Sequence, residues 1–114
     1  MFYQWETARL RLKIQEKDEP EAKPLEGYKL IVVSLDQGKG RGMYHGDYFF
    51  EAGSPDVSVE NSYIDLYFSQ EEAGKYADVT TKVQVNILYD DTERDTTVEG
   101  KIKVLNNLYK KVMT

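Results

Sequence analysis

The chain of 114 residues is long enough for one domain with a modest hydrophobic core. Hydrophobic residues make up 40% and charged residues 31%, which is too apolar for a disordered chain and too polar for a membrane protein. The absence of cysteine and the single histidine exclude disulfides, thiolate or multi-histidine metal centres, iron–sulfur clusters and cysteine nucleophiles.

Residues 7–14 alternate strictly between apolar and polar side chains, which predicts a half-buried antiparallel strand. The polar face of this strand carries a basic stripe made of Arg9, Arg11 and Lys13. The functional interpretation of the stripe is an electrostatic contact with a partner, and the alternative is a solvated face paired with acidic residues of a neighbouring strand. The segment 15–27 crowds acidic residues around two prolines and predicts a solvated loop.

Residues 28–35 are nearly continuously apolar and rich in β-branched side chains, as in a strand covered on both faces or near an edge contact. Three glycines between Gly38 and Gly42 predict a flexible loop or wide turn, which lacks the spacing and the following helix of a phosphate-binding loop. The aromatic-dense segment 43–50 is interrupted by Gly46 and predicts an irregular strand or a packed loop.

Turn-forming residues flank a short strand predicted at 57–59, and residues 62–68 alternate again as a strand. The polar face of this second strand carries Tyr63, Asp65 and Tyr67. The following Ser69 and Glu72 fit a capping box, so we expect them to satisfy each other's backbone donors. Gly74 then ends the helix after about one turn.

The clearest pattern is a hairpin over residues 79–104, in which two alternating strands flank an acidic turn. A four-residue loop places both apolar sets on one face. The pairs in this register are Tyr89 with Arg94, Ile87 with Thr96, Val85 with Val98, and Thr81 with Ile102. The same register puts Lys82 opposite Lys101, a repulsion that we expect Glu99 to relieve as a diagonal neighbour.

The last segment, residues 105–114, changes period. Leu105, Leu108 and Val112 have the spacing of one helix face, so this tail is either a short helix or an extended arm. The elements together amount to six or seven short strands with almost no helix. The sequence therefore predicts an all-β fold, a small antiparallel β-sandwich of immunoglobulin-like or jelly-roll-like kind, with a single domain over residues 1–104 followed by the tail.

Two groups of side chains are candidates for chemistry. His45 is the only histidine, and no motif of a Ser–His–Asp triad surrounds it, so we interpret it as a loop histidine among aromatics. An acidic turn has the oxygen ligands that calcium prefers but lacks EF-hand spacing, so turn stabilisation is the simpler interpretation. The acidic turn consists of Asp90, Asp91, Glu93 and Asp95. We predict no catalytic residue, no metal site and no cofactor.

Aromatic side chains are the most distinctive content, with 9 Tyr, 4 Phe and 1 Trp. Tyr and Trp give a large contact area at low entropic cost and are enriched at interfaces, although sheet packing is the alternative explanation. The predicted interface combines the aromatic N-terminus, the polar face of strand 62–68 and the tail. Its residues are Phe2, Tyr3, Trp5, Tyr63, Tyr67, Leu105, Leu108 and Val112.

A resemblance narrows the biological setting. Residues 64–76 resemble the step from a strand into an L-T-x-E-E-T turn in small β-sandwich proteins of tailed bacteriophages and prophages. Residues 83–91 and 99–104 resemble the closing hairpin of these proteins, and the opening strand 3–14 fits the same pattern. The chain thus resembles the N-terminal domain of the phage baseplate upper protein, a sandwich that docks receptor-binding parts to the tail. The resemblance implies no catalytic residues.

The expected function is that of a non-enzymatic structural or assembly module of a phage or prophage tail, associated with the baseplate. We expect it to be made in the cytoplasm of the host bacterium and to reside in the virion. The expected partners are other phage structural proteins and further copies of the chain. The net charge of -5 argues against nucleic acid, and no apolar stretch is long enough to cross a membrane. The alternative is a carbohydrate-binding module that stacks sugars on Tyr63, Tyr67 or the cluster at 44–50.

Overall fold

The computed structural model describes residues 1–14, 25–90, 92–97 and 99–114. It confirms the all-β prediction, because strands dominate and only one short helix accompanies them. The elements in chain order are β1 (Phe2–Tyr3), β2 (Ala8–Lys13), β3 (Leu30–Asp36), β4 (His45–Glu51), β5 (Val57–Ser58), β6 (Tyr63–Phe68), α1 (Gln70–Gly74), β7 (Thr80–Leu88), β8 (Arg94–Thr96) and β9 (Gly100–Leu105). Residues 15–24 of the predicted acidic loop, with Asp91 and Val98, lie outside the described residues.

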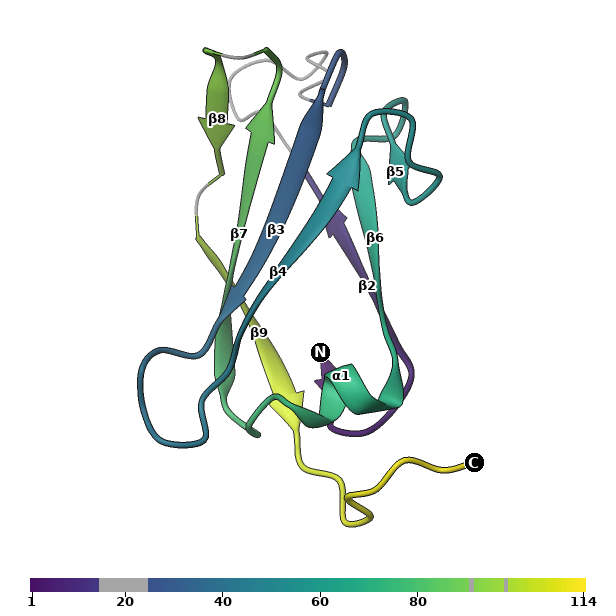
Figure 1. Cartoon of the computed structure of the whole chain (residues 1–114), viewed down its shortest axis with the longest axis vertical. Coiled ribbons are helices and arrows are strands. Elements are labelled where there is room, and N and C mark those ends of the chain that lie inside the picture. Colours follow the sequence, from purple (N-terminus) through teal and green to yellow (C-terminus); the bar gives the residue numbers. More distant parts are fainter. Residues whose placement is uncertain (15–24, 91, 98) are drawn as a thin grey trace.

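Two sheets form the two layers of the molecule (Figure 1). The larger sheet has the strand order β1-β9-β7-β3-β4 with β8 beside β7, and the smaller sheet has the order β2-β6-β5. Every pair is antiparallel except β1 with β9. The described part of the chain has more strands than the predicted six or seven, because the N-terminal aromatic segment adds β1 and the last strand is divided into β8 and β9.

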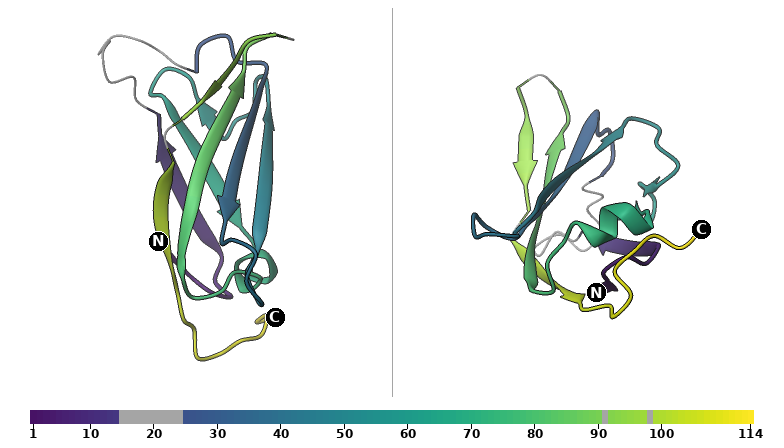
Figure 2. Two further views of the ribbon diagram at one scale, coloured as in Figure 1. Left: turned by 90° about the vertical axis from the view of Figure 1, so that its left-hand side faces the viewer. Right: turned by 60° about the horizontal axis from the view of Figure 1, so that its bottom comes forward.

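The core lies between the two sheets and follows the alternation of the strands. In β3, Ile31, Val33 and Leu35 are fully buried, while the residues between them are half-buried, so this strand is completely covered on one face only. The neighbouring strands add Leu10, Ile64, Leu66, Phe68, Val83, Val85, Ile87 and Val104 to the same interior. The helix α1 lies across one end, between the two layers (Figures 1 and 2).

Strand β4 is more regular than the sequence predicts. It pairs with β3 without interruption, from Leu30 opposite Glu51 to Asp36 opposite His45. Gly46 is therefore not the mark of an irregular segment. A Cβ at this position would meet the hydroxyl oxygen of Tyr76 and lie 2.5 Å from that of Tyr48, so the glycine allows two tyrosine side chains to approach the strand closely.

The closing hairpin agrees with the predicted register over only half of its length. Thr81 lies opposite Ile102 and Lys82 opposite Lys101, as expected, and Glu99 lies 3.9 Å from the Lys82 ammonium. Nearer the turn the predicted pairs are wrong by one residue. The observed pairs are Leu88 with Arg94, Ile87 with Asp95 and Asn86 with Thr96. The second strand holds one extra residue between Thr96 and Gly100, a bulge that separates β8 from β9.

The helix α1 begins as expected, with the Glu72 N–H donating to the Ser69 hydroxyl at 3.1 Å. The reciprocal half of the predicted capping box is replaced, since the Glu72 carboxylate accepts hydrogen bonds from Tyr44 and Tyr48 instead. Gly74 ends the helix, but its special role is packing, because a Cβ there would collide with the Trp5 indole.

The tail after β9 adopts the extended alternative and forms no helix. It folds back across the end of the molecule that holds α1 (Figure 1). The Asn107 side-chain amide donates to the Gln4 carbonyl at 2.9 Å, and the Met113 N–H donates to the Gln70 side chain at 2.7 Å. Over the described residues, no helix has the length and apolar character needed to cross a membrane.

Candidate functional site

The outer face of the smaller sheet combines cations with tyrosines, and we call it the Arg–Tyr face. It consists of Arg9, Arg11, Lys13, Tyr63, Asp65 and Tyr67. In the β2–β6 register, Arg9 lies opposite Tyr67, Arg11 opposite Asp65, and Lys13 opposite Tyr63. The face thus carries three cations and one carboxylate, although the whole chain has a net charge of -5.

Asp65 anchors the Arg–Tyr face. It is only 8% exposed, and its two carboxylate oxygens accept hydrogen bonds from Nε and Nη2 of Arg11 at 2.8 and 3.1 Å. Nε of Arg9 lies 3.5 Å from the same carboxylate. The hydrogen bonds from Arg11 hold the pKa of Asp65 below its ordinary value, so the group is charged at neutral pH. The alternative interpretation of the basic stripe, pairing with an acid of the neighbouring strand, is therefore confirmed for Arg9 and Arg11, and the contact with a partner stays a prediction.

Tyrosines complete the Arg–Tyr face. The guanidinium carbon of Arg11 lies 3.9 Å from the ring centroid of Tyr63, which is cation–π geometry. Tyr67 is 57% exposed beside Arg9. Tyr and Arg are the residue types most often responsible for binding energy at protein interfaces. Asp65 and Tyr63 together hold the Arg11 side chain in place on the face.

The prediction that Phe2 belongs to an interface at the N-terminus is wrong. It is 2% exposed and packs against Phe68, with the ring centroids 4.9 Å apart, so it belongs to the core and is not available to a partner. Pairing of β1 with β9 turns Phe2 inward and Tyr3 outward. Trp5 is half-buried and packs against Gly74 of α1.

The tail residues of the predicted interface have different environments. Leu105 is half-buried at the end of β9, opposite Tyr3. Leu108 and Val112 are exposed. Tyr63 and Tyr67, by contrast, lie on β6 in the smaller sheet. The structure therefore groups only Tyr63 and Tyr67 with the basic stripe.

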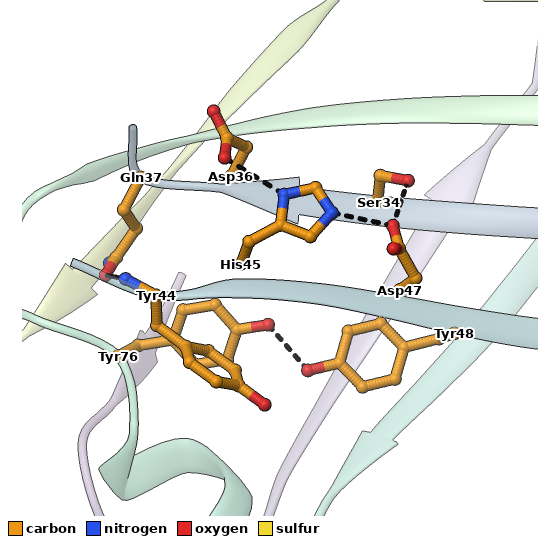
Figure 3. A network of polar contacts seen from close by, with 8 residues as sticks. All are labelled: Ser34, Asp36, Gln37, Tyr44, His45, Asp47, Tyr48 and Tyr76. Atoms are coloured by element: carbon orange, nitrogen blue, oxygen red, sulfur yellow. Dashed lines mark hydrogen bonds and ion pairs between the residues drawn. The ribbon is translucent and has the colours of Figure 1, made fainter. Parts of the chain in front are cut away.

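His45 is the centre of a chain of polar contacts on the outer face of β3 and β4 (Figure 3). Its Nδ1 lies 2.9 Å from Asp36 and its Nε2 lies 2.9 Å from Asp47. The Ser34 hydroxyl donates to Asp47 at 2.6 Å. Because both ring nitrogens contact carboxylates and the serine bonds to Asp47, this geometry is not that of a Ser–His–Asp triad, in which the imidazole accepts the serine proton.

We expect an NMR titration to place the pKa of His45 above its ordinary value, because hydrogen bonds to Asp36 and Asp47 favour the imidazolium. A raised folded-state pKa stabilises the fold below the unfolded pKa of His, and this contribution disappears as pH rises through the folded value. Asp36→Asn should lower the pKa of His45. A pKa at or below the ordinary value in the wild-type chain would contradict the arrangement.

The sequence does not predict a cluster of three tyrosines and one acid that the structure contains. The Tyr44 and Tyr48 hydroxyls donate to the same Glu72 oxygen at 3.1 and 2.8 Å. The Tyr48 hydroxyl also lies 2.5 Å from the Tyr76 hydroxyl (Figure 3). Burial raises the pKa of Tyr48 and of Tyr76 far above the ordinary value, so both stay protonated. The cluster links β4 to α1 in the interior, so that among the aromatic side chains at 44–50 only Phe49 is strongly exposed.

The acidic turn has a structural explanation. One carboxylate oxygen of Asp90 accepts hydrogen bonds from the N–H and hydroxyl of Thr92 and from the N–H of Glu93, at 2.7 to 2.9 Å. These bonds, the Thr92 N–H foremost, hold the pKa of Asp90 below its ordinary value. Within the described ranges, no group of three or more His, Asp or Glu side chains has an arrangement that could hold a metal ion.

Comparison with known proteins identifies no family. No protein-family model matches the chain, and no curated protein matches it either.

Proposed function

We propose that the chain is a non-enzymatic assembly module that binds an acidic protein segment through the Arg–Tyr face. The observation that carries this proposal is the ordered set of cations and tyrosines around Asp65, on a chain that is otherwise acidic. A partner with carboxylates and apolar side chains complements both the cations and the exposed tyrosine of the Arg–Tyr face. Carboxylates pair with the exposed cations, and apolar groups cover Tyr67.

The biological setting that we propose is the tail or baseplate of a phage or prophage, with other virion proteins as partners. This part rests on the resemblance of residues 64–76 and of the closing hairpin to phage β-sandwich proteins. Mass spectrometry of phage particles induced from the source bacterium tests it. Detection of the chain in purified particles is the expected result, and its absence from complete particles would contradict the setting.

The binding proposal predicts that the Arg–Tyr face retains a short fluorescent peptide in which Glu alternates with Val. Fluorescence anisotropy at low salt measures the affinity. Tyr67→Ala and Arg9→Ala should each weaken binding by about tenfold or more, since truncation of a hot-spot residue costs about 2 kcal/mol. The matched control is Tyr109→Ala, which removes an equally exposed tyrosine, 56% against 57%, from the tail. Equal binding of a peptide with Lys in place of Glu would contradict the proposal.

Carbohydrate binding is the second candidate, favoured by the exposed ring of Tyr67 beside Arg9, which would suit an acidic sugar. Titration with a uronic acid oligosaccharide, followed by NMR, separates the two functions. Binding of the sugar that Tyr67→Ala abolishes, together with no binding of the acidic peptide, would favour this candidate.

A further inference from the structure

Two open sheet edges of the molecule carry opposite charge patterns. Strand β2 ends the smaller sheet and β4 ends the larger sheet. In the left-hand view of Figure 2 the two strands lie along opposite sides of the molecule. The exposed side chains of β2 are the cations of the basic stripe. The exposed side chains of β4 are His45, Asp47, Phe49 and Glu51.

The register shows which backbone groups of β2 and β4 point away from the neighbouring strand. Ile14 donates its N–H to the Ser62 carbonyl at 2.8 Å, so the even-numbered residues of β2 bond to β6 and those at 9, 11 and 13 point outward. Ala52 donates its N–H to the Lys29 carbonyl at 3.1 Å, so the residues of β4 at 45, 47, 49 and 51 point outward. At both edges the outward backbone groups therefore belong to the residues with exposed side chains. The Glu51 carbonyl is already engaged, because it accepts hydrogen bonds from the Ser54 N–H at 3.1 Å and the Tyr28 hydroxyl at 2.9 Å, so Glu51 offers an added strand only its N–H.

We propose that β2 of one copy of the chain adds to β4 of a second copy as an antiparallel strand. The pairs are Arg9 with Glu51, Arg11 with Phe49, and Lys13 with Asp47. In this contact the acidic segment that binds the cations of the Arg–Tyr face is β4 of a second copy, so the inference rests on the proposed function. Main-chain hydrogen bonds supply affinity in such strand addition, and the side chains select the register.

Charge and chemistry favour this register over its neighbours. The two acids of β4 each face an exposed cation, while Arg11, which Asp65 already neutralises, faces the exposed ring of Phe49. A shift by two residues in one direction places Lys13 opposite His45, and a shift in the other leaves Asp47 without a cation. Asp47 can pair with Lys13 of the second copy through Oδ2, because its bonds to Ser34 and His45 both use Oδ1.

The arrangement of the layers suits an antiparallel contact. β2 and β4 belong to different sheets, whose outer faces point in opposite directions, and both strands run upward in Figure 1. A half-turn of the second copy about the line that joins the two edges brings the outer faces to one side and makes the strands antiparallel. Each added copy again exposes one β2 and one β4, so the contact is heterologous and produces a chain or a ring of copies.

Charge reversal tests the contact in the full chain, with size-exclusion chromatography and light scattering at rising concentration and low salt. The wild-type mass should rise above that of the monomer. The double variants Arg9→Glu/Lys13→Glu and Asp47→Lys/Glu51→Lys should each raise the apparent dissociation constant by about tenfold or more, since like charges then face each other. An equimolar mixture of the two should associate again, because each reversed edge complements the edge of the other variant.

The matched control is Lys101→Glu/Lys103→Glu, which changes the net charge as the β2 variant does but alters exposed residues of β9. It should associate like the wild type. A wild type that stays monomeric at every concentration, or a mixture that fails to associate, overturns the contact. Asp47→Lys/Glu51→Lys keeps the Arg–Tyr face complete. If it binds the Glu–Val peptide while the wild type never self-associates, the strand pairing is wrong and the proposed function stands. If the wild type does not bind the peptide, the proposed function fails.

Discussion

Replacement of Tyr76 with alanine is expected to destabilise the fold by about 3–5 kcal/mol, the usual cost of removing a buried aromatic ring. Tyr76 is 1% exposed. Its ring lies edge-on to Phe2 and Tyr44, with centroids 5.6 and 4.9 Å away, and its hydroxyl reaches Tyr48. The ring therefore joins β1 and β4 of the larger sheet to the segment after α1, and it also lies 5.9 Å from the ring of Phe68 on β6 of the smaller sheet. Its loss opens a cavity where both sheets meet. Urea denaturation measures the change.

Tyr76→Phe is the control for this prediction. It keeps the ring and removes one hydroxyl, and Tyr48 still donates to Glu72, so we expect a cost of about 1 kcal/mol. If the alanine and phenylalanine variants lose equal stability, the packing of the ring is not what holds this end of the molecule together.

Replacement of Gly46 with alanine is expected to cost about 1–3 kcal/mol, because the new methyl group would overlap the hydroxyls of Tyr48 and Tyr76 and force the tyrosine cluster apart. The effect is distinctive because alanine usually suits a strand better than glycine does. Thermal or urea unfolding of Gly46→Ala measures it, and the hydrogen bonds to Glu72 should weaken at the same time.

Gly100→Ala provides the comparison for Gly46→Ala. Gly100 also lies in a strand, but the nearest heavy atom to its added Cβ is the Val83 carbonyl oxygen at 3.9 Å. We expect a change within about 0.5 kcal/mol of the wild type. Similar costs at both positions would show that Gly46 has no special packing role.

The sequence predicts those strands whose two faces differ in polarity. Strands β2, β6 and β7 alternate apolar and polar residues, because one face meets the core and the other meets solvent. The strand β4 was harder to predict, because its inner face holds Gly46 and Tyr48 in place of aliphatic residues. The polar tyrosine hydroxyls become internal only because Glu72 accepts their hydrogen bonds.

Non-local pairing explains the remaining differences. The bulge between Thr96 and Gly100 shifts the hairpin register without changing the alternation of either strand, so composition alone does not reveal it. From the sequence, Phe2 resembles an exposed aromatic residue near the N-terminus. It becomes part of the core only because β1 pairs in parallel with β9, the last strand in the chain.

The sequence predicts the two strand faces that make up the Arg–Tyr face, but it does not predict that they lie side by side. Alternation places the basic stripe on one strand face and Tyr63, Asp65 and Tyr67 on another, and both are observed. That β2 and β6 are neighbours, and that Arg11 therefore meets Asp65, depends on the order of strands in the sheet. The contact of His45 with Asp36 has the same origin, since it needs β3 beside β4, whereas Asp47 lies two residues along the same strand as His45.

The most direct test of the account is NMR mapping of the acidic Glu–Val peptide on the isotope-labelled chain. If the Arg–Tyr face is the binding site, the amide shifts should move for Arg9, Arg11, Tyr63, Asp65 and Tyr67 and stay constant in the tail and in the Asp90 turn. Shift changes spread over the tail residues 106–114, or no changes at low salt, would contradict the claim that this face receives the partner.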